Sequence, residues 1–174
     1  MVSSIENALE RFVVSQRVVG GDTLFTLTSS VAAPATAQEI QTVWLGSEPA
    51  EVAALWLAAR SARLFEDVDF GQWGLKILDP HESKARTDFE RLSRATDLMR
   101  EDVVVGEFLG DQELLVFSPS ERGPRRVLVA LPLDPRNEWY GVARTLPEFL
   151  DAFFESPGCK YWEVHSRGHS ERAR

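Results

Sequence analysis

The spacing of apolar residues along the chain predicts several amphipathic helices. Apolar side chains recur every three or four residues in separate stretches, and three of these stretches begin with a capping-box pair such as Ser3 with Glu6. Strong helix formers after Pro49 add a largely apolar helix. The expected helices span residues 4–14, 37–43, 49–60, 82–100 and 146–154.

The helix expected over 82–100 has the clearest two-sided pattern. Glu82 and Arg86 stand four residues apart on its polar side. The opposite stripe contains Ala85, Phe89, Leu92, Thr96 and Met99. Because such a stripe is typical of a helix packed on a sheet, we expect it to face the core.

Strand patterns dominate the second half of the chain. Three apolar segments are separated by connections too short for a crossover helix, so they predict an antiparallel meander. Near-continuous apolar character in the last two of these segments indicates strands covered on both faces. The expected strands are 23–28, 73–78, 103–109, 113–117 and 126–132, with a short strand or turn at 160–164. The interval from Gly106 to Gly110 is interpreted as a bulge or a close backbone approach.

This order of elements predicts an α+β fold, in which helices cover an antiparallel β-meander sheet. A chain of 174 residues with 44% hydrophobic content suits a single domain over 1–174. Within it we expect an N-terminal helix and strand at 3–28 as an extension, a linker or loop at 29–38 and a flexible polar tail at 166–174.

The chain is acidic, and its net charge indicates which classes of partner it is suited to bind. It has 27 Asp and Glu against 19 Lys and Arg, a formal charge of −8. A general nucleic-acid binder neutralises phosphates with basic residues, so the balance favours a basic partner, or simply a well-solvated surface. A lone Cys159 excludes an internal disulfide, and no signal peptide or long apolar run is present. We therefore expect a cytoplasmic protein that does not enter the membrane.

No catalytic or metal motif stands out. His81 is isolated, and His165 and His169 lie in the polar tail near Cys159, without the usual spacing of a metal site. Nucleophile elbows and phosphate-binding glycine loops are also missing from the sequence. We expect no cofactor, no metal and no catalytic residue.

Two groups of carboxylates are candidates for a functional surface. The second group runs from Glu101 to Glu113 without an intervening basic residue. Both groups fall in expected turns, where they would be solvated and could meet a basic protein. A less favoured interpretation pairs two of them as the acid and base of an enzyme. The groups are Glu66, Asp67 and Asp69, and Glu101, Asp102, Glu107, Asp111 and Glu113.

A loop after the last strand segment, DPRNEWY, is a further candidate. It combines Asp134, Arg136, Trp139 and Tyr140, and Trp, Tyr and Arg are frequent anchors of protein interfaces. The alternative is that Trp139 packs inward. Asp134 and Arg136 are expected to be exposed.

The second half of the chain resembles the SUKH superfamily. The resemblance rests on GEFLGDQELLVF, VLVALP and EWYGVARTLPEFL, together with the Pro-led LGSEPAEVAALWLAARSARLF and FGQWGLKIL. It covers roughly residues 36–155 and depends on the order and spacing of these segments. Two positions depart from the family pattern: Arg60-Ser61-Ala62 replaces a frequent Asn-Gly-Gly turn, and Gln112-Glu113 replaces a Gly-rich run. These changes put a shared binding surface in doubt.

The resemblance implies a noncatalytic α+β module that binds another protein. In bacterial members, that partner is commonly a toxin domain, such as a nuclease, which an immunity protein blocks. The alternative is an adaptor that regulates an endogenous assembly. Combined with the charge pattern, the expected partner-binding residues are Glu66, Asp67, Asp69, Asp111, Glu113, Asp134, Arg136, Trp139 and Tyr140.

Overall fold

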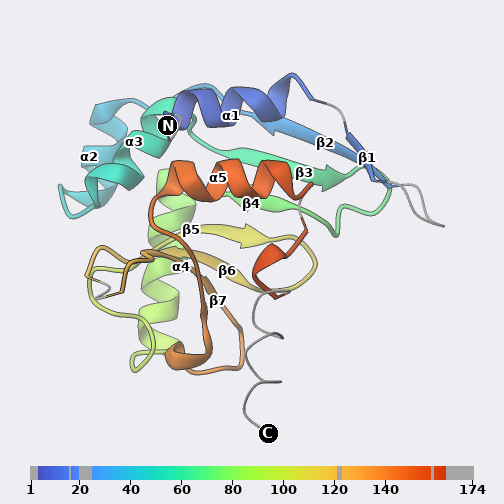
Figure 1. Ribbon diagram of the computed structural model, residues 1–174. Helices are drawn as coiled ribbons and strands as arrows, with labels where there is room; N and C mark the ends of the chain where they lie inside the picture. The colour runs from blue at the N-terminus through green and yellow to red at the C-terminus, as the bar shows by residue number, and fades with distance from the viewer. Residues whose placement is uncertain (1–3, 16, 20–24, 121–122, 158, 164–174) are drawn as a thin grey trace, which may run out of the picture.

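One antiparallel sheet organises the protein (Figure 1). The computed structural model describes residues 4–15, 17–19, 25–120, 123–157 and 159–163. Within them, eight strands follow in chain order and each pairs with the next, so the expected α+β meander is confirmed. The strands are β1 (Arg17–Val19), β2 (Phe25–Val31), β3 (Ala62–Asp67), β4 (Leu75–Ile77), β5 (Val103–Phe108), β6 (Leu114–Phe117), β7 (Val127–Ala130) and β8 (Tyr140–Ala143).

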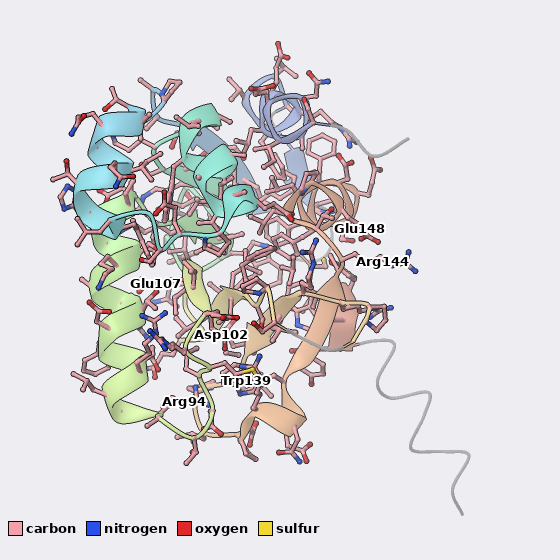
Figure 2. The ribbon with its side chains drawn as sticks, turned by 90° about the vertical axis from the view of Figure 1, so that its left-hand side faces the viewer. Arg94, Asp102, Glu107, Trp139, Arg144 and Glu148 are labelled. Carbon is pink, nitrogen blue, oxygen red and sulfur yellow. The ribbon has the colours of Figure 1, made fainter. Side chains whose placement is uncertain are left out.

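Helices lie on both sides of the sheet. Figure 1 shows α1 and α5 together in front of it, and Figure 2 shows α4 on the opposite side. Side chains of Thr36, Asp79 and Thr145 cap three of the helices as N-caps. At the first helix the N-cap is Ser4, and the expected cap Ser3 lies outside the described residues. The helices are α1 (Ile5–Val13), α2 (Ala37–Trp44), α3 (Ala50–Ala58), α4 (Pro80–Ser93) and α5 (Leu146–Glu155), with a 3₁₀ turn, η1 (Arg136–Glu138).

The main core lies between the first face of the sheet and helices α1, α3 and α5. Its centre is aromatic: the Phe12 ring packs edge-on to Phe65 with 5.0 Å between ring centroids, and Phe149 stacks on Phe153 at 5.6 Å. Burial of such rings supplies a large share of the hydrophobic stabilisation. The N-terminal helix therefore packs into the same core as the closing helix.

A smaller core covers the second face of β5, β6 and β7. It contains Leu98, Val104, Val116, Leu128 and Trp139 among other residues. Every residue of β6 and β7 is buried, which confirms that these strands are covered on both faces. The cover on this side comes from α4, the segment after it and the loop 131–139.

The expected orientation of the helix over 82–100 was wrong. Helix α4 ends at Ser93, and its predicted core stripe is exposed along its whole length. The buried side instead carries Ser83 and Thr87, whose hydroxyls bond the backbone of Val104. The three residues of β4 pair with Gly106, Glu107 and Phe108 of β5. The amide and carbonyl of Val104 lie beyond that pairing, and the two hydroxyls satisfy them.

Three strand predictions also needed correction. Strand β2 continues to Val31, into the expected linker, while β1, β3 and β8 were not predicted at all. Strand β4 is shorter than expected, and Trp73 precedes it. Residues 161–163 form a short helical turn, so the strand alternative expected for 160–164 is wrong, while residue 164 and the expected tail lie outside the described residues. The register of β5 on β6 shifts between Val104 and Gly106, so a bulge lies where the Gly106–Gly110 interval begins.

Candidate partner-binding surface

The connection between β3 and β4, residues 68–74, is an ordered turn. The amide of Gly71 donates to the Asp67 carbonyl at 2.9 Å, and the amide of Asp69 donates to the Asp67 carboxylate at 3.0 Å. Asp67 is itself buried at the end of β3. The expectation that the Asp67 carboxylate is solvated is therefore wrong, because its buried side chain closes the turn.

Large apolar side chains project from this turn into solvent. Phe70 is 74% exposed and Trp73 is 40% exposed, and Val68 is also exposed. Asp69 is exposed beside them, while Glu66 pairs with Arg63 at 2.5 Å. An ordered turn that holds aromatic rings in water is typical of an interaction surface.

The turn between β5 and β6 packs directly against residues 68–74. The amide of Leu109 donates to the Gly74 carbonyl at 2.9 Å. Gly110 has φ +90°, and a Cβ there would lie 2.3 Å from the Gln72 carbonyl oxygen. This close approach places Asp111 beside the aromatic turn, and we call residues 66–73 with 109–113 the turn face.

Lys160 neutralises part of the turn face. Its ammonium lies 3.1 Å from the Asp111 carboxylate and 2.8 Å from that of Glu113. Burial raises the pKa of Glu113, and the hydrogen bond and charge of Lys160 oppose that rise. The stretch from Glu101 to Glu113 contains no basic residue, but the fold brings Lys160 to two of its carboxylates from about 50 residues further along the chain. Glu113 is buried, so its predicted exposure was wrong.

The loop 131–139 folds back over the second face of the sheet. Trp139 is buried there, as one of the two sequence interpretations expected, and its indole N–H donates to the Asp134 carbonyl at 3.1 Å. The guanidinium carbons of Arg94 and Arg136 lie 5.0 Å and 5.3 Å from the ring centroid. Figure 2 shows Arg94 and Trp139 close together below Asp102.

Arg136 does not have the exposed position expected for it. Its guanidinium donates to Asp102 at 2.5 Å and to the Ser118 hydroxyl at 2.9 Å, and Asp102 is fully buried. Asp134 is exposed as expected, while Tyr140 begins β8 and packs partly against the main core. Arg136 and Trp139 therefore hold the loop in place, and of these four residues Asp134 is the one whose side chain is exposed.

A groove of about 670 Å³ runs between α4 and the β5–β6 turn. Inside it, Arg86 donates to Glu90 at 2.9 Å and to Glu107 at 2.9 Å, so one guanidinium engages both carboxylates. Phe89 and Pro132 line the groove beyond these charges. Glu107 was noted in the sequence as an acidic residue, but its partner Arg86 was not predicted.

The nine predicted contact residues therefore fall into two groups in the structure. Five belong to the turn face, and four belong to the loop 131–139 and the start of β8. Val68, Phe70 and Trp73 were missed, although they had a signal: three large apolar residues in the otherwise polar stretch EDVDFGQWG. These residues were not recognised as part of a turn, because β3, the strand that precedes them, had not been predicted.

Comparison with known proteins found no matching family model and no matching curated protein. Among the described residues, no group of three or more His, Cys, Asp or Glu is arranged to hold a metal ion. None of the described helices combines the length and apolar character needed to span a bilayer.

Proposed function

We propose that this protein is a noncatalytic binding module of the immunity type, which blocks another folded protein by covering it with the turn face. One observation carries the proposal: Phe70 and Trp73 are exposed on an ordered turn beside the carboxylates of Asp69 and Asp111. Preorganised aromatic anchors lose little conformational entropy on binding, which favours tight association. The SUKH resemblance supports the same class of function.

The charges around the aromatic rings suit a basic partner. Asp69 is exposed, Asp111 is exposed although it pairs with Lys160, and the whole chain has a formal charge of −8. Electrostatic attraction speeds the encounter of such a pair, while burial of apolar rings slows dissociation. The partner proposed is a basic toxin domain, for example a nuclease, whose active site becomes sterically blocked.

The test is capture of a stoichiometric partner from the native cell. Tagged wild-type protein should recover one polypeptide, and the Phe70→Ser/Trp73→Ser variant should lose it. A matched control is Val13→Ser/Val14→Ser, which removes two exposed apolar side chains from the end of α1. The proposal fails if both variants capture the partner as well as wild type does.

The identity of the captured protein provides the second part of the test. Its activity should be inhibited on adding the purified wild-type chain, and much less on adding the Phe70→Ser/Trp73→Ser variant. The association rate should fall as salt is raised, because the attraction is between surface charges. A captured protein with unchanged activity would contradict the inhibitor role.

A further inference from the structure

Four of the five carboxylates in the turn face already have a partner within the chain. Glu66 pairs with Arg63. The carboxylate of Asp67 is buried and accepts the amide of Asp69. The two carboxylates of the β5–β6 turn share the ammonium of Lys160. The acidic character of the turn face is therefore largely neutralised before any partner arrives.

Asp69 is the exception. It is exposed, and its carboxylate forms no hydrogen bond or ion pair with the part of the chain that the structure describes. The turn that carries it is closed, because the amide of Asp67 donates to the Trp73 carbonyl at 3.3 Å and the amide of Gly71 donates to the Asp67 carbonyl at 2.9 Å. Phe70, the next residue in the chain, is largely exposed. One unpaired carboxylate and two exposed aromatic side chains thus share an ordered turn.

The protein already binds an arginine with the same combination of groups. Between α1 and α5, the guanidinium carbon of Arg11 lies 4.2 Å from the centroid of the Phe154 ring, and the same guanidinium donates to Asp151 at 2.9 Å. A guanidinium suits both groups, because its plane stacks on an aromatic face while its N–H groups bond a carboxylate. A lysine ammonium is compact and strongly hydrated, so it gains less from the ring.

We propose that the turn face binds one arginine side chain of its partner, with the guanidinium paired to Asp69 and stacked on Phe70. This inference rests on the proposed function and defines the partner more narrowly: its contact surface carries an arginine within an apolar area. A polybasic surface would need several unpaired carboxylates, whereas the turn face offers that of Asp69. Trp73 contacts the apolar area and shields the ion pair from water, which strengthens it.

The first test uses a small probe and needs no partner. Nα-acetyl-arginine amide is titrated into the isotope-labelled full chain, and the amide signals of residues 68–73 should shift in the NMR spectrum. The matching citrulline amide has the same shape without the charge and should cause little shift. Asp69→Asn should weaken binding of the arginine probe about fivefold, the upper end for an exposed ion pair. Equal shifts from the two probes, or shifts centred elsewhere, would overturn the proposal.

The second test compares two variants against the captured polypeptide by surface plasmon resonance. Asp111→Asn is the matched control for Asp69→Asn, because it removes the same charge from the same face at a carboxylate that Lys160 already holds. Both variants should slow association equally, since long-range attraction depends on the total charge. Asp69→Asn alone should speed dissociation, by about fivefold. If it dissociates no faster than Asp111→Asn, the arginine contact is rejected.

The partner supplies a reciprocal test. Its arginines are replaced one at a time by glutamine, and one replacement should weaken the complex with wild type as much as Asp69→Asn does. Combining that replacement with Asp69→Asn should cause little further loss, because both changes remove the same ion pair. A loss spread evenly over several arginines would indicate a polybasic surface and overturn the proposal.

These experiments separate the arginine contact from the proposed function. Suppose that Phe70→Ser/Trp73→Ser abolishes capture while Asp69→Asn dissociates like Asp111→Asn. The binding surface is then correct and the arginine contact is wrong. If the arginine probe shifts residues 68–73 but no polypeptide is captured from the cell, the proposed function fails and the arginine site stands.

Discussion

Thr87 of α4 accepts a hydrogen bond from the backbone amide of Val104, with 2.9 Å between Oγ1 and N. Ser83 completes the arrangement by donating to the Val104 carbonyl at 2.6 Å. These two hydroxyls form the hydrogen bonds to Val104 of β5 that a neighbouring strand would otherwise form. The requirement to satisfy this buried backbone determines which side of α4 faces the sheet.

Thr87→Val should destabilise the fold although it preserves the side-chain shape. The Val104 amide would remain buried without an acceptor, which costs about 1–3 kcal/mol. Chemical denaturation measures the loss of unfolding free energy. The control is Thr96→Val at an exposed position, where little change is expected. Equal losses in the two variants would show that the hydroxyl of Thr87 is not required.

Arg136→Leu should be more damaging than substitutions elsewhere in the loop. It would leave Asp102, which is fully buried, without its guanidinium partner. Breaking one side of a buried ion pair costs about 3–5 kcal/mol. Denaturation monitored by tryptophan fluorescence checks both the stability and the environment of Trp139. Asn137→Leu, in the same loop and exposed, is the control. A loss below about 1 kcal/mol would contradict the assigned role.

Glu113 should make stability decline as the pH rises. Its pKa is raised in the folded state, chiefly by burial, so the folded chain holds this proton more tightly than the unfolded chain does. The stabilisation that Glu113 gives through this proton is therefore complete below pH 4.5, the pKa in the unfolded chain. It is lost as the pH rises through the higher pKa of the folded chain. The unfolding free energy of wild type should fall from acidic to neutral pH by more than that of Glu113→Gln, which cannot lose this proton. Glu138→Gln, which is exposed, should follow wild type.

Gly110→Ala should disturb the turn face. Its φ of +90° disfavours any side chain, and the added Cβ would lie 2.3 Å from the Gln72 carbonyl oxygen. Such strain costs about 1–3 kcal/mol before any relaxation. Hydrogen exchange should show faster exchange in residues 68–74. Gly123→Ala is the control, because its nearest neighbour would be 4.0 Å away. Unchanged exchange in the Gly110 variant would contradict the close packing of the two turns.

The fold was easier to predict than the candidate surface. The meander and most helices follow from local periodicity, because side-chain burial repeats with the geometry of each element. Strands β3 and β8 were missed because their apolar positions do not alternate cleanly; β3 has Phe65 at φ +53° in the middle. The ion pairs of Lys160 with Asp111 and Glu113, and of Arg136 with Asp102, were not predicted, because the basic residues approach from distant parts of the chain.

From the sequence alone follow the α+β class, the antiparallel meander of β5, β6 and β7, and the two-sided burial of β6 and β7, since these depend on local pattern and short connections. Only the tertiary structure decided which side of α4 is buried and which charges are neutralised. Hydrophobic periodicity places the apolar stripe on one side of a helix but does not say which side a neighbouring strand requires. Here, the unsatisfied backbone of Val104 needs hydroxyl partners, so the apolar stripe with Phe89 and Leu92 faces outward.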